Sequence, residues 1–277
     1  VLRACLFSRS RCEHVLLLTV HHIACDARSL SIYIDECMQF YLAEAAGSAP
    51  GLKDVRYEYA DYIVMQSDML AGDRGRHLLA CWESARAGMP DALALPADFS
   101  RPALQTFQGS SIFFESGSGL YEAVKKGAQA EGVTLPAFLL AAFQLQLMRL
   151  SGQTDVGIGV VASGRTRAEH ADICGYCVNP VVVRARVERP LSRKEFLTAT
   201  AASLLNALDH QEYPFTLLVE KLAPRRHPGR APLFQALFNC MTRQSLGAAA
   251  HFLCPPAQGP PVQLGHLSVL PYLIPQQ

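Results

Sequence analysis

Two adjacent histidines followed closely by an aspartate are the clearest candidates for chemistry in this sequence. His21 and His22 end an apolar run over residues 15–20, and Asp26 follows just before an expected helix. An imidazole has a pKa of about 6.5, so near neutral pH it can accept a proton or orient an N–H group. A strand end holds such side chains rigidly, and a nearby carboxylate can brace them. The spacing suits an acid–base site and a hydrogen-bonded surface histidine equally, so both interpretations stay open at this point.

The elements that must position these residues are a strand pair and a helix. Residues 1–7 and the apolar run before His21 are expected to be strands joined by a short turn. Apolar side chains then recur at helical spacing over residues 27–46, and Gly47 is expected to end that helix. Asp26 is well placed to cap the helix, a contribution of about 1 kcal/mol. Capping the helix and bracing the site are compatible roles.

The rest of the chain mixes helical and extended patterns without strict alternation. One expected helix follows residues 57–62, contains Trp82 and stops near residue 88. Further helices are expected over residues 120–130, 134–152, 193–210 and 215–222, and Thr134 is expected to cap the second of these. Expected strands cover residues 108–115, 156–161, 180–187 and 233–240. A Pro-rich tail over residues 271–277 shows no closing element. This order indicates α+β layers rather than a doubly wound sheet.

Composition excludes several classes of protein. The 25 basic and 24 acidic residues give a net charge of +1, so no basic field is available to attract nucleic acid or an anionic membrane. The apolar stretches are too short to span a bilayer, and no signal-peptide pattern opens the chain. The nine cysteines are scattered through apolar segments, which favours free thiols and a cytoplasmic location.

Three other patterns could suggest different chemistry. Cys174 and Cys177 form a C-x-x-C pair, which can be redox-active or half of a zinc site. No second such pair and no histidine cluster with ligand spacing accompanies it, so we expect core thiols and no metal. Cys25 lies inside the histidine motif, a position that could suggest a cysteine nucleophile activated by histidine. We do not expect that chemistry here. Gly157 and Gly159 lack the third glycine of a dinucleotide loop, so a nicotinamide cofactor is not expected.

The stretch from His21 to Ala27 resembles the HHxxxDG signature of condensation domains, which belong to multimodular nonribosomal peptide synthetases of secondary metabolism. Other acyltransferases share this signature, but five further segments, in family order, are similar to condensation-domain motifs. They are YEYADY (57–62), LPADFSRP (95–102), ICGYCVNPVVVR (173–184), HQEYPF (210–215) and RHPGRAPL (226–233). Together these elements cover nearly the whole chain, which is identified as a member of this family.

The resemblance implies a fold of the chloramphenicol-acetyltransferase type, with two α+β lobes facing each other across a tunnel. Residues 1–102 would be the later part of the N-terminal lobe, and residues 103–277 would be the C-terminal lobe. Family members carry a segment ahead of the histidine motif and continue beyond the end of this sequence. We therefore expect a fragment of a longer polypeptide, with an incomplete first lobe.

The resemblance also implies amide formation between two thioesters carried on the phosphopantetheine arms of carrier proteins. His22 matches the family's catalytic histidine, as a general base or as a positioner of the amine, and His21 matches its supporting neighbour. No cofactor is expected to be bound, because phosphopantetheine arrives on the partners. The expected partners are donor and acceptor carrier proteins and neighbouring adenylation or polyketide synthase modules, with neither nucleic acid nor membrane.

Four further positions take expectations from the resemblance. Asp26 matches an aspartate that braces the motif through an arginine of the earlier segment, so we expect Asp26 to lack that partner. Arg165 matches an arginine expected to brace a loop. Asn179 is a candidate near the tunnel, with a turn residue before proline as the equal alternative. Ala27 replaces the usual glycine, a mild change if the backbone there is helical.

Two alternatives to amide formation stay open. The first is a related catalyst on the same fold, either an epimerase or an ester-forming acyltransferase. Cyclisation domains are disfavoured because they carry aspartates in place of the histidine pair. The second is a degenerate domain that only docks carrier or tailoring proteins. Ala27 leaves room for that function, whereas retention of both histidines and Asp26 speaks against it.

Overall fold

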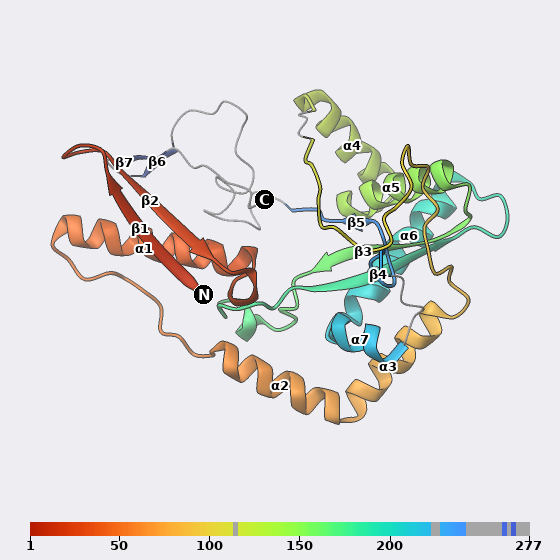
Figure 1. Ribbon diagram of the computed structural model, residues 1–277, viewed down its shortest axis with the longest axis horizontal. Helices are drawn as coiled ribbons and strands as arrows, with labels where there is room; N and C mark the ends of the chain where they lie inside the picture. Colours follow the sequence, from red (N-terminus) through yellow and green to blue (C-terminus); the bar gives the residue numbers. More distant parts are fainter. Residues whose placement is uncertain (113–115, 223–227, 242–261, 265–266, 270–277) are drawn as a thin grey trace. The chain divides into compact units, whose positions relative to one another are not determined.

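The computed structural model has mixed helix and sheet, as the α+β assignment predicts (Figure 1). It describes residues 1–112, 116–222, 228–241, 262–264 and 267–269. Contacts divide the chain into two compact units that do not follow chain order. Unit 1 comprises residues 1–67, 165–178 and 241–277, and unit 2 comprises residues 68–164 and 179–240.

Unit 1 opens with a strand pair. β1 (Leu2–Ser8) and β2 (His14–Val20) are antiparallel, with Leu2 opposite Val20. The two predicted strands are thus confirmed. A second antiparallel pair in this unit, β6 (Val262–Leu264) with β7 (Leu267–Val269), was not predicted from the sequence.

A single 3-10 turn leads from this strand pair into the long helix of unit 1. The turn is η1 (His22–Ala24), and the helix is α1 (Ala27–Ala46), with the predicted bounds. Gly47 ends α1 with a φ of 63°, a left-handed conformation that glycine adopts without steric cost. Unit 1 also contains η2 (Ala168–His170) and the first part of α2 (Tyr59–Ala71).

Unit 2 is built on a three-stranded sheet with the order β4–β3–β5. β3 (Asp155–Ala162) pairs antiparallel with β4 (Asn179–Arg186) and parallel with β5 (Leu237–Phe238). Helices pack around this sheet (Figure 1). They are α3 (Asp73–Arg86), α4 (Ser118–Ala130), α5 (Leu135–Ser151), α6 (Arg193–Asp209) and α7 (Phe215–Leu222).

The core of unit 2 is apolar and continuous. Alternate residues of β4, Val181 and Val183, are buried together with Ile158 of β3 and Leu140 of α5. Such alternation is expected when one face of a sheet is covered by helices. Thr134 caps α5 by accepting a hydrogen bond from Ala137 N at 3.3 Å, as predicted.

The expected boundary between residues 102 and 103 does not coincide with the division into units. Residues 68–102 group with unit 2, because Leu78 and Trp82 are buried in its core. Residues 165–178 group with unit 1, because their backbone hydrogen-bonds to the start of α1.

The single helix expected to contain Trp82 is in fact two helices, and that prediction was wrong. Gly72 separates α2 from α3 with an extended backbone (φ −89°, ψ −174°). Gly75, one turn later, packs against the preceding helix so closely that a Cβ there would lie 2.5 Å from the carbonyl oxygen of Leu70. Only glycine permits this tight corner, so the helical pattern continues while the helix axis breaks.

Two expected strands differ from the structure. Residues 108–112 form no strand: Phe107 has a φ of 58°, and Ile112 is 87% exposed. The remaining expected residues, 113–115, lie outside the described part of the chain, as do residues 226–227 of the RHPGRAPL segment and the tail over residues 271–277. Of the strand expected over 233–240, only Leu237–Phe238 pairs, because Leu233 turns the chain with a φ of 66°.

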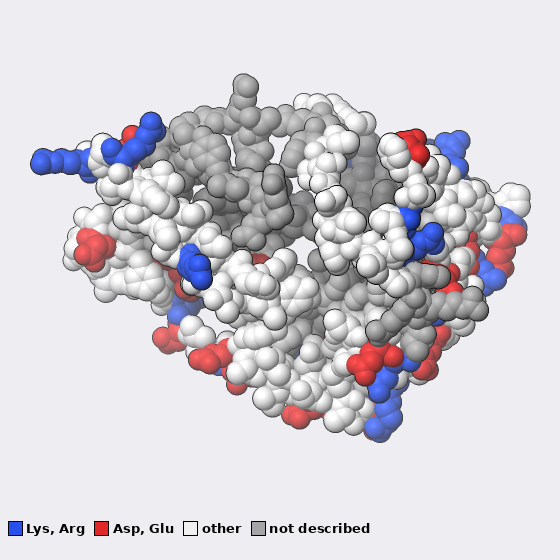
Figure 2. Space-filling view, in the orientation of Figure 1, with Lys and Arg blue, Asp and Glu red and all other residues white. Residues whose placement is uncertain are grey.

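Within the described residues, no single helix has the length and apolarity needed to cross a membrane. α4 and α5 reach that length only as a pair, and the pair bends by 99° at the break between them. On the face shown in Figure 2, basic and acidic side chains are interspersed. That mixture agrees with the net charge of +1.

Candidate functional site

The histidine motif lies on the turn between β2 and α1. His21 precedes η1 and caps it, because its Nδ1 accepts a hydrogen bond from Ile23 N at 3.1 Å. Its backbone N–H donates to Val1 O at 2.9 Å, which ties the turn to β1. His22 is the first residue of η1 and its side chain is exposed. His21 therefore supports the local backbone, and His22 presents its imidazole to solvent.

Asp26 anchors this turn from within unit 1. Only 2% of the residue is exposed. Its Oδ1 accepts hydrogen bonds from the backbone N–H and the hydroxyl of Ser29, both at 2.9 Å. The predicted N-cap of α1 is confirmed, and the cap fixes the residue four positions after His22.

Arg165 is the partner of Asp26, so the expectation that Asp26 lacks one was wrong. Arg165 Nη1 donates to Asp26 Oδ2 at 2.6 Å, and Nη2 donates to Oδ1 at 3.0 Å. The two side chains are only 6% and 1% exposed. This bidentate geometry is the strong form of an arginine–carboxylate pair. The two residues are 139 positions apart, so their spacing could not indicate the contact.

The segment over residues 173–178 completes the network around Asp26. Ser29 Oγ accepts a hydrogen bond from the Gly175 N–H at 2.9 Å. Its single hydroxyl hydrogen is shared between Asp26 Oδ1 and the Gly175 carbonyl, each 2.9 Å away. The N–H of Cys177 donates to Asp26 Oδ2 at 3.1 Å, and Arg165 Nη2 donates to Ile173 O at 2.8 Å. The carboxylate therefore joins the start of α1 to this distant segment.

Tyr176 connects this hydrogen-bond network to His22 through a contact between their rings. The two rings meet edge to face, with centroids 5.3 Å apart and planes at 71°. Tyr59 fixes the backbone of Tyr176, because its hydroxyl donates a hydrogen bond to Tyr176 O at 3.0 Å. Gly175 is required here, because a Cβ would lie 2.1 Å from the Tyr59 ring.

Ser29, Tyr59 and Tyr176 were not singled out from the sequence. Tyr59 and Tyr176 do fall inside the YEYADY and ICGYCVNPVVVR segments, which were the only available signal. Ser29 looked like an ordinary first-turn residue of α1. Its contacts with Gly175 depend on the fold, so the sequence does not indicate them.

The charges of the buried pair are stabilised by each other. Burial alone would raise the pKa of the Asp26 carboxyl, but hydrogen bonds and charge from Arg165, with those from Ser29, outweigh burial and hold the pKa below its ordinary value. Burial alone would likewise lower the pKa of Arg165, and the Asp26 carboxylate raises it instead. Both groups are therefore ionised at neutral pH.

The cysteines near this network are protonated thiols at neutral pH. Burial, followed by the nearby Asp26 charge, raises the pKa of Cys25 to about 11. Burial also raises the pKa of Cys177 to about 11, against an opposing effect of Arg165, and raises the pKa of Cys174. Because the thiolate is the nucleophile and the metal ligand, these pKa shifts disfavour a Cys–His nucleophile and a zinc or redox role for the C-x-x-C pair.

Ala27 and Asn179 have clear structural settings. Ala27 is the first residue of α1 and has no positive φ, so the conformational freedom of glycine is not needed there. Asn179 begins β4 in unit 2. Its amide nitrogen donates to Gln211 O and Tyr213 O at 2.8 and 2.7 Å, and its oxygen accepts from Phe215 N at 2.8 Å. Its amide thus anchors the HQEYPF segment.

Relatives share the chain's sequence over most of its length. A family model for the condensation domain matches residues 1–251. Tyrocidine synthase 2 of Brevibacillus parabrevis is 37% identical over 226 residues, which are 82% of this chain and 6% of that protein. Malpinin synthetase of Mortierella alpina is 36% identical over 238 residues, 86% of this chain and 3% of that protein.

Solved structures share its fold. The X-domain from teicoplanin biosynthesis superposes with a TM-score of 0.76 at 26% identity, covering 85% of this chain and 54% of that one. A four-domain nonribosomal peptide synthetase bound to AMP and glycine gives a TM-score of 0.77 at 23% identity, covering 94% of this chain and 19% of that one. The first condensation domain of the CDA synthetase gives 0.67 at 20% identity, covering 87% and 52%.

The chain spans a small part of the synthetases it matches and about half of the matched single-domain structures. The family match, the relatives above 30% identity and the shared fold agree with the ordered motifs around His22 and Asp26. On these grounds the chain belongs to the condensation domain family of nonribosomal peptide synthetases.

Proposed function

We propose that this chain provides the histidine motif of a condensation domain that forms an amide between two carrier-bound thioesters. The donor would be an acyl or peptidyl thioester and the acceptor an aminoacyl thioester. Each would arrive on the phosphopantetheine arm of a carrier protein, in a polypeptide with adenylation or polyketide synthase modules. The observation that carries the proposal is the exposed His22 ring on a turn fixed by the buried Asp26–Arg165 pair.

The chemistry requires a neutral, correctly aimed amine. The amine nitrogen attacks the thioester carbonyl, the C–N bond forms, and the C–S bond breaks. One proton leaves the nitrogen and one is taken up by the departing pantetheine sulfur. A neutral imidazole can accept the first proton, or it can orient the amine by hydrogen bonding. In either role the ring must be held close to the reacting atoms.

The geometry supplies two restraints on His22. Asp26 fixes the backbone of its turn, because the Asp26 carboxylate accepts hydrogen bonds from Ser29, Arg165 and Cys177. Its ring is limited on one side by the edge-to-face contact with Tyr176. A rigid turn with an exposed imidazole suits a group that must meet substrates arriving from solution.

The test compares native protein with His22→Ala in the condensation domain that contains this chain, using loaded donor and acceptor carrier proteins. We expect amide product from the native domain and a decrease of at least about tenfold in His22→Ala, measured by mass spectrometry. His14→Ala is the matched control, because His14 is another exposed histidine of unit 1, bonded to Ser8 Oγ at 2.9 Å. Equal product from native domain and His22→Ala would remove His22 from the mechanism.

A docking domain is the second candidate. The X-domain from teicoplanin biosynthesis has also been solved in complex with OxyB, and that structure matches this chain at 26% identity with a TM-score of 0.75. A domain of this family can therefore serve as a binding surface for another protein. Absence of product from the native domain, with carriers shown to be loaded, would favour this function over catalysis.

A further inference from the structure

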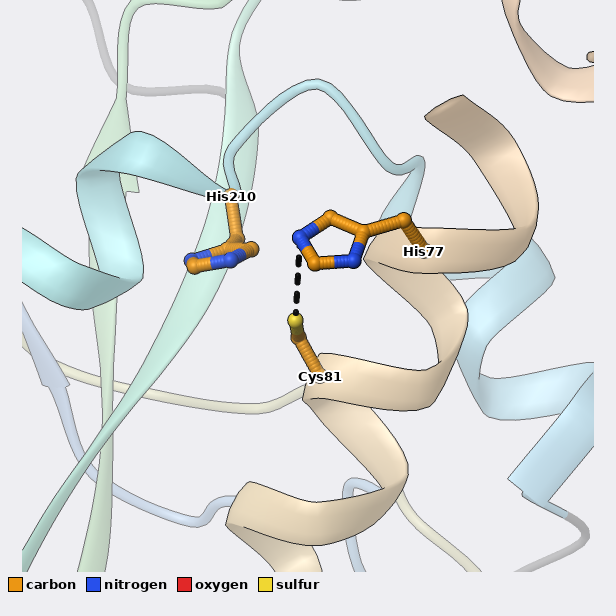
Figure 3. A group of neighbouring side chains, drawn as sticks. All are labelled: His77, Cys81 and His210. Carbon is orange, nitrogen blue, oxygen red and sulfur yellow. Dashed lines mark hydrogen bonds between the residues drawn. The ribbon is translucent and has the colours of Figure 1, made fainter. Parts of the chain in front are cut away.

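Three side chains that bind transition metals meet in unit 2. His77 and Cys81 lie one turn apart on α3, and His210 directly follows α6. Figure 3 shows all three side chains pointing toward one another. Their potential ligand atoms lie within 4.8 Å of one another. From the sequence we expected no metal, because no histidine cluster with ligand spacing accompanies the C-x-x-C pair. His210 is far along the chain from His77 and Cys81, so spacing does not reveal this group.

The closest pair already has the spacing of two ligands on one ion. Cys81 Sγ lies 3.6 Å from His77 Nε2. Zinc–sulfur and zinc–nitrogen bonds of about 2.3 and 2.0–2.1 Å, at a tetrahedral angle, place the two ligand atoms about 3.6 Å apart. One ring nitrogen of His210 lies within 4.8 Å of the other two ligand atoms, so His210 would have to move closer to complete the site.

The ring nitrogen of His210 that would not bind the metal already has a hydrogen-bond partner. His210 Nδ1 lies 2.6 Å from Asn206 O, a carbonyl oxygen that can only accept, so Nδ1 donates this hydrogen bond and Nε2 is the nitrogen left to bind a metal. A backbone carbonyl that accepts from the second ring nitrogen is the usual companion of a histidine ligand. Trp82 Nε1 donates to His210 O at 3.2 Å and fixes the backbone of the same residue.

We propose that His77, Cys81 and His210 bind Zn²⁺. Imidazole and thiolate donors suit zinc and disfavour calcium and magnesium, which prefer oxygen. Three protein ligands leave one coordination position for water. The ion would link α3 to the HQEYPF segment, where Arg74 already contacts Glu212 at 3.1 Å. Arg74 also donates to Asp209 O, at the end of α6, at 3.2 Å. A plain S–H···N hydrogen bond between Cys81 and His77 is the competing arrangement.

The test is a cobalt titration of the metal-free chain. Cobalt(II) bound by a thiolate in a tetrahedral site gives a near-ultraviolet charge-transfer band and intense visible bands. We expect one equivalent per chain, displaced by Zn²⁺, with binding at least about tenfold weaker in Cys81→Ser and His77→Ala. His77 is exposed on a helix, so His77→Ala keeps the fold, which circular dichroism checks. Cys37→Ser, an exposed thiol of α1, is the matched control and keeps the bands.

A second measurement follows stability. Zn²⁺ should raise the thermal midpoint of the native chain and leave that of His77→Ala unchanged, because only a ligand that binds the folded state stabilises it. Absence of the thiolate band in native protein would overturn the proposal in favour of the hydrogen bond. The same band at the same affinity in Cys81→Ser would overturn it too, by assigning the ion to other cysteines.

Discussion

Each unit contains a bidentate arginine–aspartate pair with a shortest contact of 2.6 Å, yet the two pairs have different surroundings. In unit 1, Arg165 and Asp26 are 6% and 1% exposed, and the Asp26 oxygens also accept from Ser29 and from Cys177 N. In unit 2, Arg184 and Asp155 are 16% and 17% exposed. There, Arg184 Nη1 donates to Ala85 O and Ala87 O at the end of α3.

The comparison shows that equal distances do not mean equal roles. Arg184 uses its spare donors to satisfy carbonyls that the end of a helix leaves unpaired, in a setting that water can reach. The Asp26 carboxylate is cut off from water and depends on its protein partners for every hydrogen bond. The Arg184–Asp155 pair stabilises a helix end, whereas the Arg165–Asp26 pair fixes the turn that carries His22.

The largest difference should follow from removing the arginine of the buried pair. Arg165→Met leaves the Asp26 charge buried without its partner, at a cost of about 3–5 kcal/mol in the local unfolding free energy. Hydrogen exchange of peptides from α1 and residues 165–178 measures this loss. The double variant Asp26→Asn/Arg165→Met should recover part of it, because the unpaired charge is gone. Unchanged exchange in Arg165→Met would show that the ion pair does not hold the turn.

A smaller loss should follow at the partly exposed pair. Arg184→Met removes charge-assisted hydrogen bonds that water can partly replace, so we expect about 2 kcal/mol, measured by hydrogen exchange of α3 and β4 peptides. Arg28→Met is the lower reference, since the Arg28–Asp172 pair is 41% and 62% exposed and such pairs contribute about 0–1 kcal/mol. A loss at Arg184 equal to that at Arg165 would contradict the distinction between the two pairs.

The smallest expected effect is on stability at acidic pH, because burial of Asp26 opposes the lowering of its pKa. The folded-state pKa of Asp26 lies below the ordinary value of 3.8, so its stabilisation is complete above that value. The stabilisation is lost as pH falls through the lowered pKa. Urea unfolding followed by circular dichroism should therefore show native protein and Asp26→Asn converging in stability at low pH. A gap between them that is independent of pH would contradict this assignment.

The sequence predicted local features of the fold well. The bounds of α1, its Asp26 cap and its Gly47 end follow from short-range patterns, and so do the Thr134 cap and the pair β1–β2. The break at Gly72 was missed because its cause, the close approach of Gly75 to Leu70, is a packing contact. The strand expected over 233–240 was overestimated because Leu233 adopts a left-handed conformation that its residue type does not indicate.

The candidate site was predictable only in part. His21, His22 and Asp26 are neighbours in the chain, so their pattern was visible. The Asp26–Arg165 pair, the Ser29 bridge to Gly175 and the Tyr176 contact with His22 join segments more than a hundred residues apart. The grouping of His210 with Cys81 has the same origin. Contacts between distant segments depend on the path of the chain, which no local spacing contains.

Trp82 has a practical consequence for work on this protein. It is the only tryptophan in the chain, and it is 6% exposed in the core of unit 2. Intrinsic tryptophan fluorescence therefore reports on unit 2. Local unfolding of the turn that carries His22 has no tryptophan to report it. An engineered tryptophan on α1, for example Phe40→Trp at a 53% exposed position, would give the histidine motif an optical probe of its own.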